Sequence, residues 1–495
     1  MEAGKKKPKY RAVNRAQALW TDWQVEELIG ADHPARLIWE LVGRLDLKAF
    51  EADANSFENE PGRSRWEPRL LVSVLAYGYT LGTGSAREIA RLMGHEPGLR
   101  WLVALETINH HTLSDFRTQQ LERLQGILTQ VLAVLAEENL VDFQTLLQDG
   151  TKIQAQASRQ SFHRRPTLTT HLAAAQACVA ELDRRAAESE AGAARSKSEA
   201  AAARAAREKL QRMEAAMEEL TRREAVASAD KRAEVRVSES EPEAKKMKHA
   251  DGGFSPSYNL QLVTEGKNGV TVGWEVSAAS NDQQQLQPGL AAAQRGTQQP
   301  VNTMIADAGY ATRANVEAMA EQKITLVSPR LTDEQRQAGA LKKAGIAPEF
   351  AAAKFIGTKA GTLRCPAGTE LVQIGQKQHH GMPVEVYVGD AAVCGACPHQ
   401  PQCCPQGTAR KVERVIESAV VQAHDRRMTE PAMQALYKKR QQFAEYANLR
   451  IKWNWGLRRF RLRGLEKVTK EAFWMVLAFV LDRRNSLRRQ AVAAA

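Results

Sequence analysis

Apolar residues recur at three- and four-residue spacing through residues 1–140, a pattern that predicts helices. In SAREIARLMG, Ser85 stands three residues before Glu88, which is the spacing of a helix-capping box. The pattern from HHTLSDFR to AEENL predicts one long amphipathic helix with Thr112 as its N-cap. Short helices in series are compatible with a helix-turn-helix DNA reader, although most helical bundles have other roles.

Strand patterns begin at residues 141–155, where two leucines lead into Asp149. They return at Tyr258–Ala279, where two β-rich runs flank EGKNG and predict a hairpin. A helical segment, QQLQPGLAAAQRG, precedes two further strands in VNTMIADAGY and ITLVSPR. This mixture of strands and helices predicts an α/β fold.

Two stretches interrupt these strands. From about His171 to Ala225 the chain is rich in Ala, Glu and Arg and lacks proline, which predicts long helices in a coiled-coil-like hairpin. The second stretch holds a cysteine cluster whose C-x2-C spacing fits a structural zinc site. The candidate ligands are Cys365, Cys394, Cys397 and Cys403, with Cys404 or His399 as substitutes. The alternative is a set of reduced thiols in a small β insertion.

The net charge of +12 is concentrated between residues 410 and 495, and the rest of the chain is close to neutral. A basic block suits a surface that faces a polyanion, because neutralising phosphates releases counterions; the alternative is a solvated basic helix. The start, MEAGKKKPKYR, is also basic and lacks the apolar core of a secretory signal, so it could be an arm that touches phosphate. The longest apolar run, Ala472–Leu481, is about half a membrane span and predicts a buried helix in a soluble intracellular protein.

Asp149 and Asp307 each follow an apolar run and precede small residues. An aspartate of this kind more often starts a turn. However, acids at the carboxyl ends of neighbouring strands can lie within a few ångströms, where they repel each other unless a cation joins them. Mg²⁺ suits such carboxylates, and two ions about 4 Å apart can activate an attacking oxygen and stabilise a leaving one.

A third candidate element is the helical segment from Leu436 to Val468. Its spacing places Glu445 and Lys452 on one face, and a carboxylate flanked by cations suits a metal ligand beside DNA. Surface ion pairs along a helix are the alternative. Trp453 and Trp455 could wedge against a splayed base, or could belong to the core.

In this order, the motifs resemble the DDE transposases of bacterial insertion sequences, and in particular the branch numbered eleven-eighty-two. The shared features are the aspartate after the first strand, DAGY, a Y-x2-R-x4-E-x6-K helix and LRRFRLRGLEKV. ETINHHTLSDFR, YNLQ, CPAG and CGACPHQPQCC resemble other landmarks of that branch, so the resemblance covers nearly the whole chain. One departure is that members often have Glu-Pro-Val-Phe at the third acid, where this chain has Glu445-Tyr446-Ala447-Asn448.

The resemblance implies an α/β fold with an RNase H-like catalytic core, a helical N-terminal domain and two insertions. The implied parts are a helical DNA-binding domain (1–140), the first part of the core (141–165), an alanine-rich helical insertion (166–249), the second part of the core (250–335), a cysteine-containing insertion (336–410) and a basic helical part with the third acid (411–495). Asp149, Asp307 and Glu445 would be catalytic and would hold Mg²⁺ or Mn²⁺. The implied DNA contacts are Tyr437, Arg440, Lys452, Arg458, Arg459 and Arg461.

The implied function is that of a transposase, which binds the terminal inverted repeats of its element and catalyses cleavage and strand transfer of double-stranded DNA. Such an enzyme is expected to act as a homodimer on DNA in the bacterial cytoplasm, associated with the nucleoid and not with a membrane. The alternative is a catalytically inactive DNA-binding protein derived from a transposase. The presence of all three acids favours the enzyme.

Overall fold

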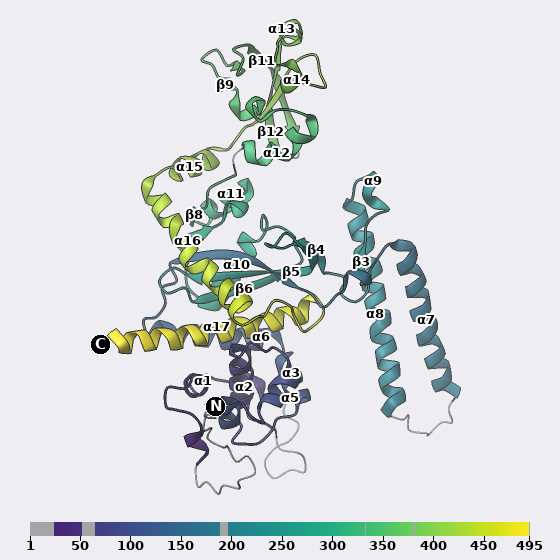
Figure 1. Cartoon of the computed structure of the whole chain (residues 1–495), viewed down its shortest axis with the longest axis vertical. Helices are drawn as coiled ribbons and strands as arrows, with labels where there is room; N and C mark the ends of the chain where they lie inside the picture. The colour runs from purple at the N-terminus through teal and green to yellow at the C-terminus, as the bar shows by residue number, and fades with distance from the viewer. Residues whose placement is uncertain (1–23, 52–64, 189–196, 332, 380–381, 495) are drawn as a thin grey trace, which may run out of the picture.

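The computed structural model describes residues 24–51, 65–188, 197–331, 333–379 and 382–494. The basic start at residues 1–11 lies outside these ranges. Figure 1 shows a mixed sheet at the centre, helices of the N-terminal part below it, and two long helices that project to one side. A second, smaller sheet lies at the far end of the molecule.

The N-terminal part is helical, as predicted. Its α-helices are α1 (Pro34–Val42), α2 (Pro68–Thr80), α3 (Ala86–Leu92), α4 (Pro97–Leu102), α5 (His110–Arg117) and α6 (Leu121–Glu137), with short 3-10 turns η1 (Val25–Leu28) and η2 (Lys48–Phe50). The predicted N-cap of α3 is confirmed, because the Ser85 side chain accepts a hydrogen bond from the Glu88 backbone N–H.

The prediction of one long helix from residue 110 onward is wrong. The chain forms α5 with Asn109, not Thr112, as its N-cap, and then breaks before α6. Side chains from a distant helix satisfy the carbonyl groups at this break: the Trp474 indole N–H donates to the Arg117 carbonyl at 3.0 Å. Packing between segments far apart in sequence therefore ends α5, a cause that helical periodicity cannot reveal.

The central sheet contains β1 (Thr145–Gln154), β4 (Lys245–Lys248), β5 (Phe254–Glu265), β6 (Thr271–Ser277), β7 (Thr303–Ala306) and β8 (Thr325–Val327). Its order is β4-β5-β1-β7-β8, with β6 also paired to β5. The predicted β5–β6 hairpin is confirmed. Strand β5 runs antiparallel to β1, β6 runs antiparallel to β5, and β1, β7 and β8 are parallel neighbours. The predicted helix after the hairpin is α10 (Leu286–Thr297), and α11 (Arg313–Glu321) joins β7 to β8.

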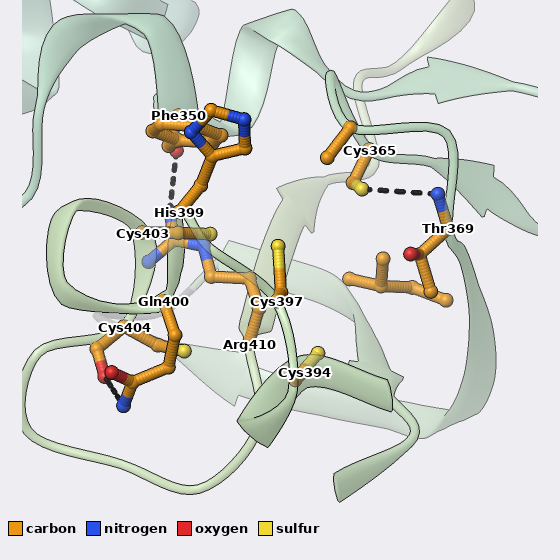
Figure 2. Close-up of a pocket in the computed structure, with 12 residues that line it drawn as sticks. Phe350, Cys365, Thr369, Cys394, Cys397, His399, Gln400, Cys403, Cys404 and Arg410 are labelled. Carbon is orange, nitrogen blue, oxygen red and sulfur yellow. Dashed lines mark hydrogen bonds between the residues drawn. The ribbon is translucent and has the colours of Figure 1, made fainter. Parts of the chain in front are cut away.

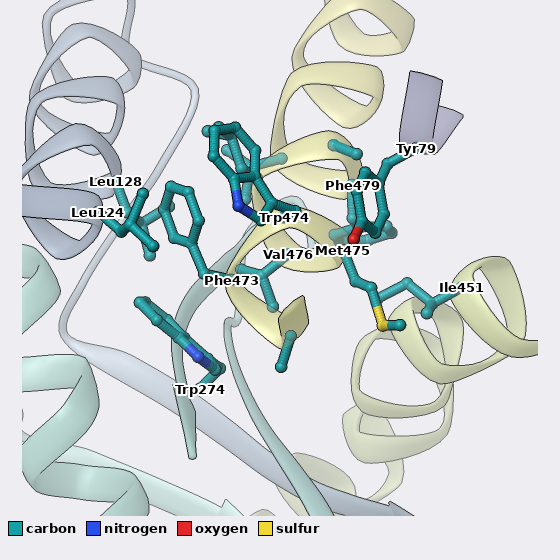
Figure 3. Packing of buried hydrophobic residues seen from close by; sticks show 14 of the residues in the cluster. Tyr79, Leu124, Leu128, Trp274, Ile451, Phe473, Trp474, Met475, Val476 and Phe479 are labelled. Atoms are coloured by element: carbon teal, nitrogen blue, oxygen red, sulfur yellow. The ribbon is translucent and has the colours of Figure 1, made fainter. Parts of the chain in front are cut away.

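Helix α17 (Leu465–Ala494) joins the sheet to the N-terminal helices. Its apolar run, Ala472–Leu481, is at most 1% exposed, so the prediction of a buried helix is confirmed. Figure 3 shows Phe473 between Leu124 and Leu128 on one side and Trp274 on the other. None of the described helices combines the length and apolar character that a membrane span requires.

The alanine-rich stretch forms two long helices, as predicted. They are α7 (Arg165–Glu188) and α8 (Lys197–Val226), followed by the short α9 (Ala229–Arg232), and they lie side by side as an arm beside the sheet (Figure 1). A two-stranded ribbon of β2 (Phe162–His163) and β3 (Val237–Ser238) closes the root of this arm. Strand β4 lies inside the range expected for the insertion, yet it pairs with β5 of the central sheet.

The cysteine region contains a second sheet of order β13-β12-β11-β10-β9. Its elements are α12 (Asp333–Ala344), η5 (Pro348–Phe350), η6 (Ala352–Lys354), β9 (Ile356–Gly357), β10 (Leu363–Arg364), β11 (Glu370–His379), β12 (Met382–Gly389), α13 (Ala391–Gly395), α14 (Gln400–Cys403) and β13 (Lys411–Val415). Helices α15 (Ala419–Arg427) and α16 (Pro431–Leu449) and the π-helical turn η7 (Arg450–Asn454) lead on to α17. The expectation of helix from Val412 onward is wrong at β13, because that segment pairs with β12 as an added strand.

Candidate functional site

Two aspartates lie next to each other where the parallel pairing of β1 with β7 stops: Asp149 lies inside β1, and Asp307 directly follows β7. Gln148 of β1 is in register with Ala306 of β7, so the residues that follow, Asp149 and Asp307, occupy neighbouring positions. Side chains alternate along a strand, so both aspartates lie on the sheet face that carries Leu147. Helix α16 covers this face, since its Ala444 packs in one apolar cluster with Leu147.

Side chains of α16 contact both aspartates directly. The Tyr437 hydroxyl donates to Asp307 Oδ1 at 3.4 Å, and the Asn448 amide Nδ2 donates to Asp149 Oδ2 at 3.1 Å. These two residues lie about three helical turns apart on the stripe that faces the sheet, with Ala444 between them. The part of α16 between Tyr437 and Asn448 therefore spans the two aspartates.

Arg440 lies between the acids. Its Nη1 is 3.9 Å from Asp149 Oδ1 and its Nη2 is 3.4 Å from Glu445 Oε1. Burial acts to lower the pKa of the guanidinium, but nearby groups outweigh burial and raise its pKa above the ordinary value. Those groups are Asp307, Asp149, Tyr437 and Glu445. One guanidinium thus compensates the charge of all three predicted acids.

Glu445 stands at the edge of this site. Its side chain is 54% exposed, whereas those of Asp149 and Arg440 are 21% and 15% exposed. Among the described residues, the carboxylate oxygens of these three acids do not all lie within 4.8 Å of one another. The structure therefore brings the two aspartates together and links Glu445 to Asp149 through Arg440.

The environment of Asp149 favours the binding of a cation. The pKa of Asp149 is raised to about 6: burial raises it, and the charge of Asp307 adds to this, while Arg440, the Gly150 backbone N–H and Asn448 act in the opposite direction. The Asn448 Oδ1 atom is buried and has no hydrogen-bond partner in the described part of the chain. Carboxylate and amide oxygens are the donors that Mg²⁺ prefers, so the donor set fits this ion.

Landmark residues of the sequence form a polar layer under the aspartates. Asn259 and Gln261, from YNLQ, both donate to Asp282 Oδ1, and the Tyr310 hydroxyl, from DAGY, donates to Gln261 at 2.6 Å. A side chain at Gly150 would collide with this layer, since its Cβ would lie 2.8 Å from Asp282 Oδ1. A larger residue after the first aspartate would therefore displace these polar side chains.

Lys452, a predicted DNA contact, lies in the π-helical turn η7. Its Nζ donates to the Lys152 carbonyl at 2.9 Å and lies 3.4 Å from Thr151 Oγ1, so it is held against β1 just beyond Asp149. The expected helical face shared by Glu445 and Lys452 is altered by this turn, because a π turn inserts extra residues into the helical repeat. Lys452 is half-buried, whereas Glu445 is exposed.

The three predicted phosphate contacts beyond η7 lie on an irregular segment, so the expectation of helix there is wrong. The segment instead bridges to the end of β1 through Arg459 and Gln154, and the Arg459 guanidinium donates to Gln154 Oε1 at 2.8 Å. The Arg458 guanidinium lies 4.0 Å from the centre of the Trp453 ring. Arg458, Arg459 and Arg461 are all exposed.

The two tryptophans differ in their surroundings. Trp453 is 55% exposed beside the basic segment, so it is available to an outside ligand. Trp455 packs against the main hydrophobic core, and the Arg450 guanidinium lies over its ring at 5.5 Å. Trp455 is therefore a core residue, and of the two tryptophans only Trp453 is placed to contact a base of the DNA.

The cysteines line one small pocket in the second sheet domain (Figure 2). The pocket contains Cys365, Cys394, Cys397, Cys403, Cys404, His399 and Arg410. Burial raises the pKa of Cys403 to about 11 and also raises that of Cys404. Within the ranges that the structure describes, no three of the sulfur atoms lie within 4.8 Å of one another, so the thiols as placed do not form a tetrahedral zinc site.

Comparison with known families identifies two segments of the chain. Residues 364–483 match the transposase DDE domain, and residues 23–119 match a transposase domain (DUF772). Together the matches indicate a transposase of the DDE class, and Glu445 lies inside the first segment. Asp149 and Asp307 lie outside both segments, so their assignment depends on the geometry described above. No curated protein and no solved structure matches the chain.

Proposed function

We propose that this chain is an active, magnesium-dependent transposase of the branch numbered eleven-eighty-two, which binds terminal inverted repeats and cleaves and joins DNA. The observation that carries this proposal is the site under α16: two aspartates side by side, with Arg440 facing both of them and Glu445. A cluster of acids compensated by a single cation is suited to binding further cations and phosphate.

The strand order supports an RNase H-like core. In the proposed arrangement the first acid lies on the first strand, the second on the fourth, and the third on a late helix. Counted without the short edge strand β4, the main sheet strands are β1, β5, β6 and β7, so Asp149 belongs to the first and Asp307 follows the fourth. Glu445 lies on α16, after the second sheet domain.

In this proposal Asp149, Asp307 and Glu445 hold Mg²⁺ or Mn²⁺. Bound in pairs, such ions activate the attacking oxygen of a phosphodiester reaction and stabilise the leaving one. Arg440 neutralises the acids in their absence and is placed to bind a phosphate of the DNA end, as are Tyr437 and Lys452. Asn448 orients Asp149 through its amide hydrogen bond.

The same proposal gives roles to the N-terminal helices, the basic segment and the cysteine pocket. Residues 24–137 and the exposed basic segment after η7 would bind double-stranded DNA, and paired cutting of two element ends would require a homodimer on DNA in the cytoplasm, at the nucleoid. The cysteine pocket is structural, because its buried thiols have raised pKa values that keep them protonated and unreactive. Zinc binding there would need a rearrangement of the sulfur atoms.

Cleavage of DNA that carries the inverted repeats flanking the gene tests the proposed function. Purified protein with Mg²⁺ is expected to nick or cut at the repeat ends and to join those ends to target DNA, and EDTA is expected to stop both reactions. Binding to the repeats without any cleavage, in either Mg²⁺ or Mn²⁺, would instead support the alternative of an inactive DNA-binding protein derived from a transposase.

The rate of cleavage is predicted to depend on the ionisation of Asp149. Its pKa is raised to about 6, and a carboxylate must be deprotonated to hold a metal ion. At subsaturating Mg²⁺ the rate should therefore fall about tenfold for each pH unit below about 6 and level off above it. A pH–rate profile at two Mg²⁺ concentrations checks this, because higher Mg²⁺ should move the midpoint to lower pH. A midpoint that does not respond to Mg²⁺ would contradict the assignment to a metal ligand.

A further inference from the structure

A second cluster of potential metal ligands lies at the root of the helical arm, far from the acids in sequence. His171 Nδ1 is 2.8 Å from Glu239 Oε2, and His163 Nε2 is 3.7 Å from the same oxygen. In the part of the chain that the structure describes, these three residues form the set of His, Cys, Asp or Glu side chains whose ligand atoms all lie within 4.8 Å of one another.

The geometry of this cluster is close to that of a metal site. Ligand atoms about 2.0–2.1 Å from a tetrahedral zinc ion lie about 3.3 Å apart. The two measured distances, 2.8 and 3.7 Å, bracket this value, so small side-chain rotations would accommodate an ion. The imidazole rings of His163 and His171 lie edge to face with centroids 5.0 Å apart, and one nitrogen of each ring contacts Glu239 Oε2.

The donors and their exposure identify the class of ion. Two imidazoles and one carboxylate are borderline ligands that favour zinc and related divalent transition ions over Mg²⁺, which prefers oxygen donors alone. The three side chains are 23%, 40% and 32% exposed, so an ion can reach them from solvent and can complete its coordination with water. A protein site with three ligands and an open position is a known arrangement for zinc.

The three ligands come from the two ends of the helical insertion. His163 lies in β2, His171 lies in the second turn of α7, and Glu239 directly follows β3. The ribbon is already held by the Glu239 backbone N–H, which donates to the Ser161 carbonyl, and an apolar cluster that includes Leu168 lies beneath. An ion here would tie α7 to the ribbon and fix the direction in which the arm leaves the core.

We propose that His163, His171 and Glu239 bind one zinc-class divalent ion, which links helix α7 to the β2–β3 ribbon at the root of the helical arm. This site is independent of the proposed magnesium site, because it shares no residue with that site and needs a softer ion. It is also independent of the cysteine pocket, because it contains no sulfur donor.

Titration of the full-length protein with Co²⁺ and Zn²⁺ tests the proposal. The protein is first stripped with a chelator, and excess Mg²⁺ is present throughout to occupy carboxylate sites. The wild type is expected to bind Co²⁺ with a visible spectrum typical of nitrogen and oxygen ligands and without a thiolate charge-transfer band. The double variant His163→Gln/His171→Gln should lose one ion per chain, or bind it at least about tenfold more weakly.

Two controls separate this site from others. His110→Gln/His111→Gln removes an adjacent pair of histidines on α5 that belongs to no such ligand cluster within the described ranges, and Cys394→Ser/Cys397→Ser disables the cysteine pocket. Both should keep the ion with nitrogen and oxygen ligands. Glu239→Gln, which preserves the size of the side chain, repeats the test if circular dichroism shows that the double histidine variant is unfolded.

Three results would overturn the proposal. They are a wild type that binds no Co²⁺ or Zn²⁺, a wild-type cobalt spectrum that arises from thiolate ligands alone, and equal stoichiometry and affinity in the wild type and the folded histidine or glutamate variants. Because cleavage of DNA is not measured in this experiment, its outcome is separate from that of the proposed transposase activity.

Discussion

Replacement of Asp149 by asparagine is expected to reduce DNA cleavage at least about a thousandfold, or about 4 kcal/mol in activation free energy, while DNA binding stays near the wild-type level. Asparagine has nearly the same shape and can keep the contact with Asn448, but it cannot supply the negative charge that holds a metal ion. Binding should persist because it depends on the basic surface. Cleavage and gel-shift assays with the same DNA measure the two effects separately.

The same loss is expected for Asp307→Asn and for Glu445→Gln. Two exposed acids next to the same elements serve as matched controls. Asp142 lies before the start of β1, and Glu430 directly precedes α16. Asp142→Asn and Glu430→Gln change charge by the same amount and should leave cleavage within about threefold of wild type. If the control variants lose as much activity as Asp149→Asn, or if Asp149→Asn loses binding and cleavage together, the assignment of metal ligands is wrong.

The two aspartates could be predicted from sequence because their signals are local. Each follows a run of apolar residues, and small residues after it predict that the strand ends there. That end is confirmed for Asp307, which follows β7, but it is wrong for Asp149, because β1 continues to Gln154 through its pairing with β5. What the sequence does not contain is the pairing of β1 with β7, which leaves Gln148 opposite Ala306 and so places Asp149 beside Asp307. Many residues separate the strands, and their pairing depends on the closure of the whole sheet.

The contacts of α16 could not be predicted from residue spacing. Helical periodicity gives the angle between Glu445 and Arg440 around the helix but does not show which side of the helix lies against the sheet. The buried Ala444 fixes that side, and this leaves Glu445 on the exposed flank while Asn448 reaches Asp149. Asn448 lies at a position where this chain departs from the motif that it otherwise resembles, so its role as a hydrogen-bond donor follows from the structure alone.

The errors in predicted secondary structure have one physical origin. Residues 110–137 have helical periodicity throughout, yet α5 ends where Trp474 of α17 takes the Arg117 carbonyl. Residues 455–464 also contain good helix formers, yet the segment is held in an irregular path by its bridge to the end of β1. In both places a contact with a distant segment outweighs local propensity, which amounts to less than about 1 kcal/mol per residue.

The basic segment after η7 provides the second prediction with a large effect. Arg458 and Arg459 are exposed. Arg459 pairs with Gln154 at the end of β1, and the Arg458 Nε–H donates to the Lys452 carbonyl at 3.3 Å. The Arg458 guanidinium stacks on Trp453, and that of Arg459 is oriented by Gln154, so both are held in place before DNA arrives. We therefore expect both to contact phosphates of the cleaved end.

The double variant Arg458→Gln/Arg459→Gln is expected to weaken binding to every DNA sequence and to reduce the slope of log affinity against log salt by roughly 1 to 2, since each phosphate contact contributes about 0.9. Arg488→Gln/Arg489→Gln is the matched control, because it removes the same charge from an exposed arginine pair near the end of α17. A change in net charge alone would affect both variants equally, whereas direct contacts would lower the slope only in the first. If the first variant keeps the wild-type slope, these arginines serve the local structure around Trp453 and Gln154, and the DNA must follow another path across the protein.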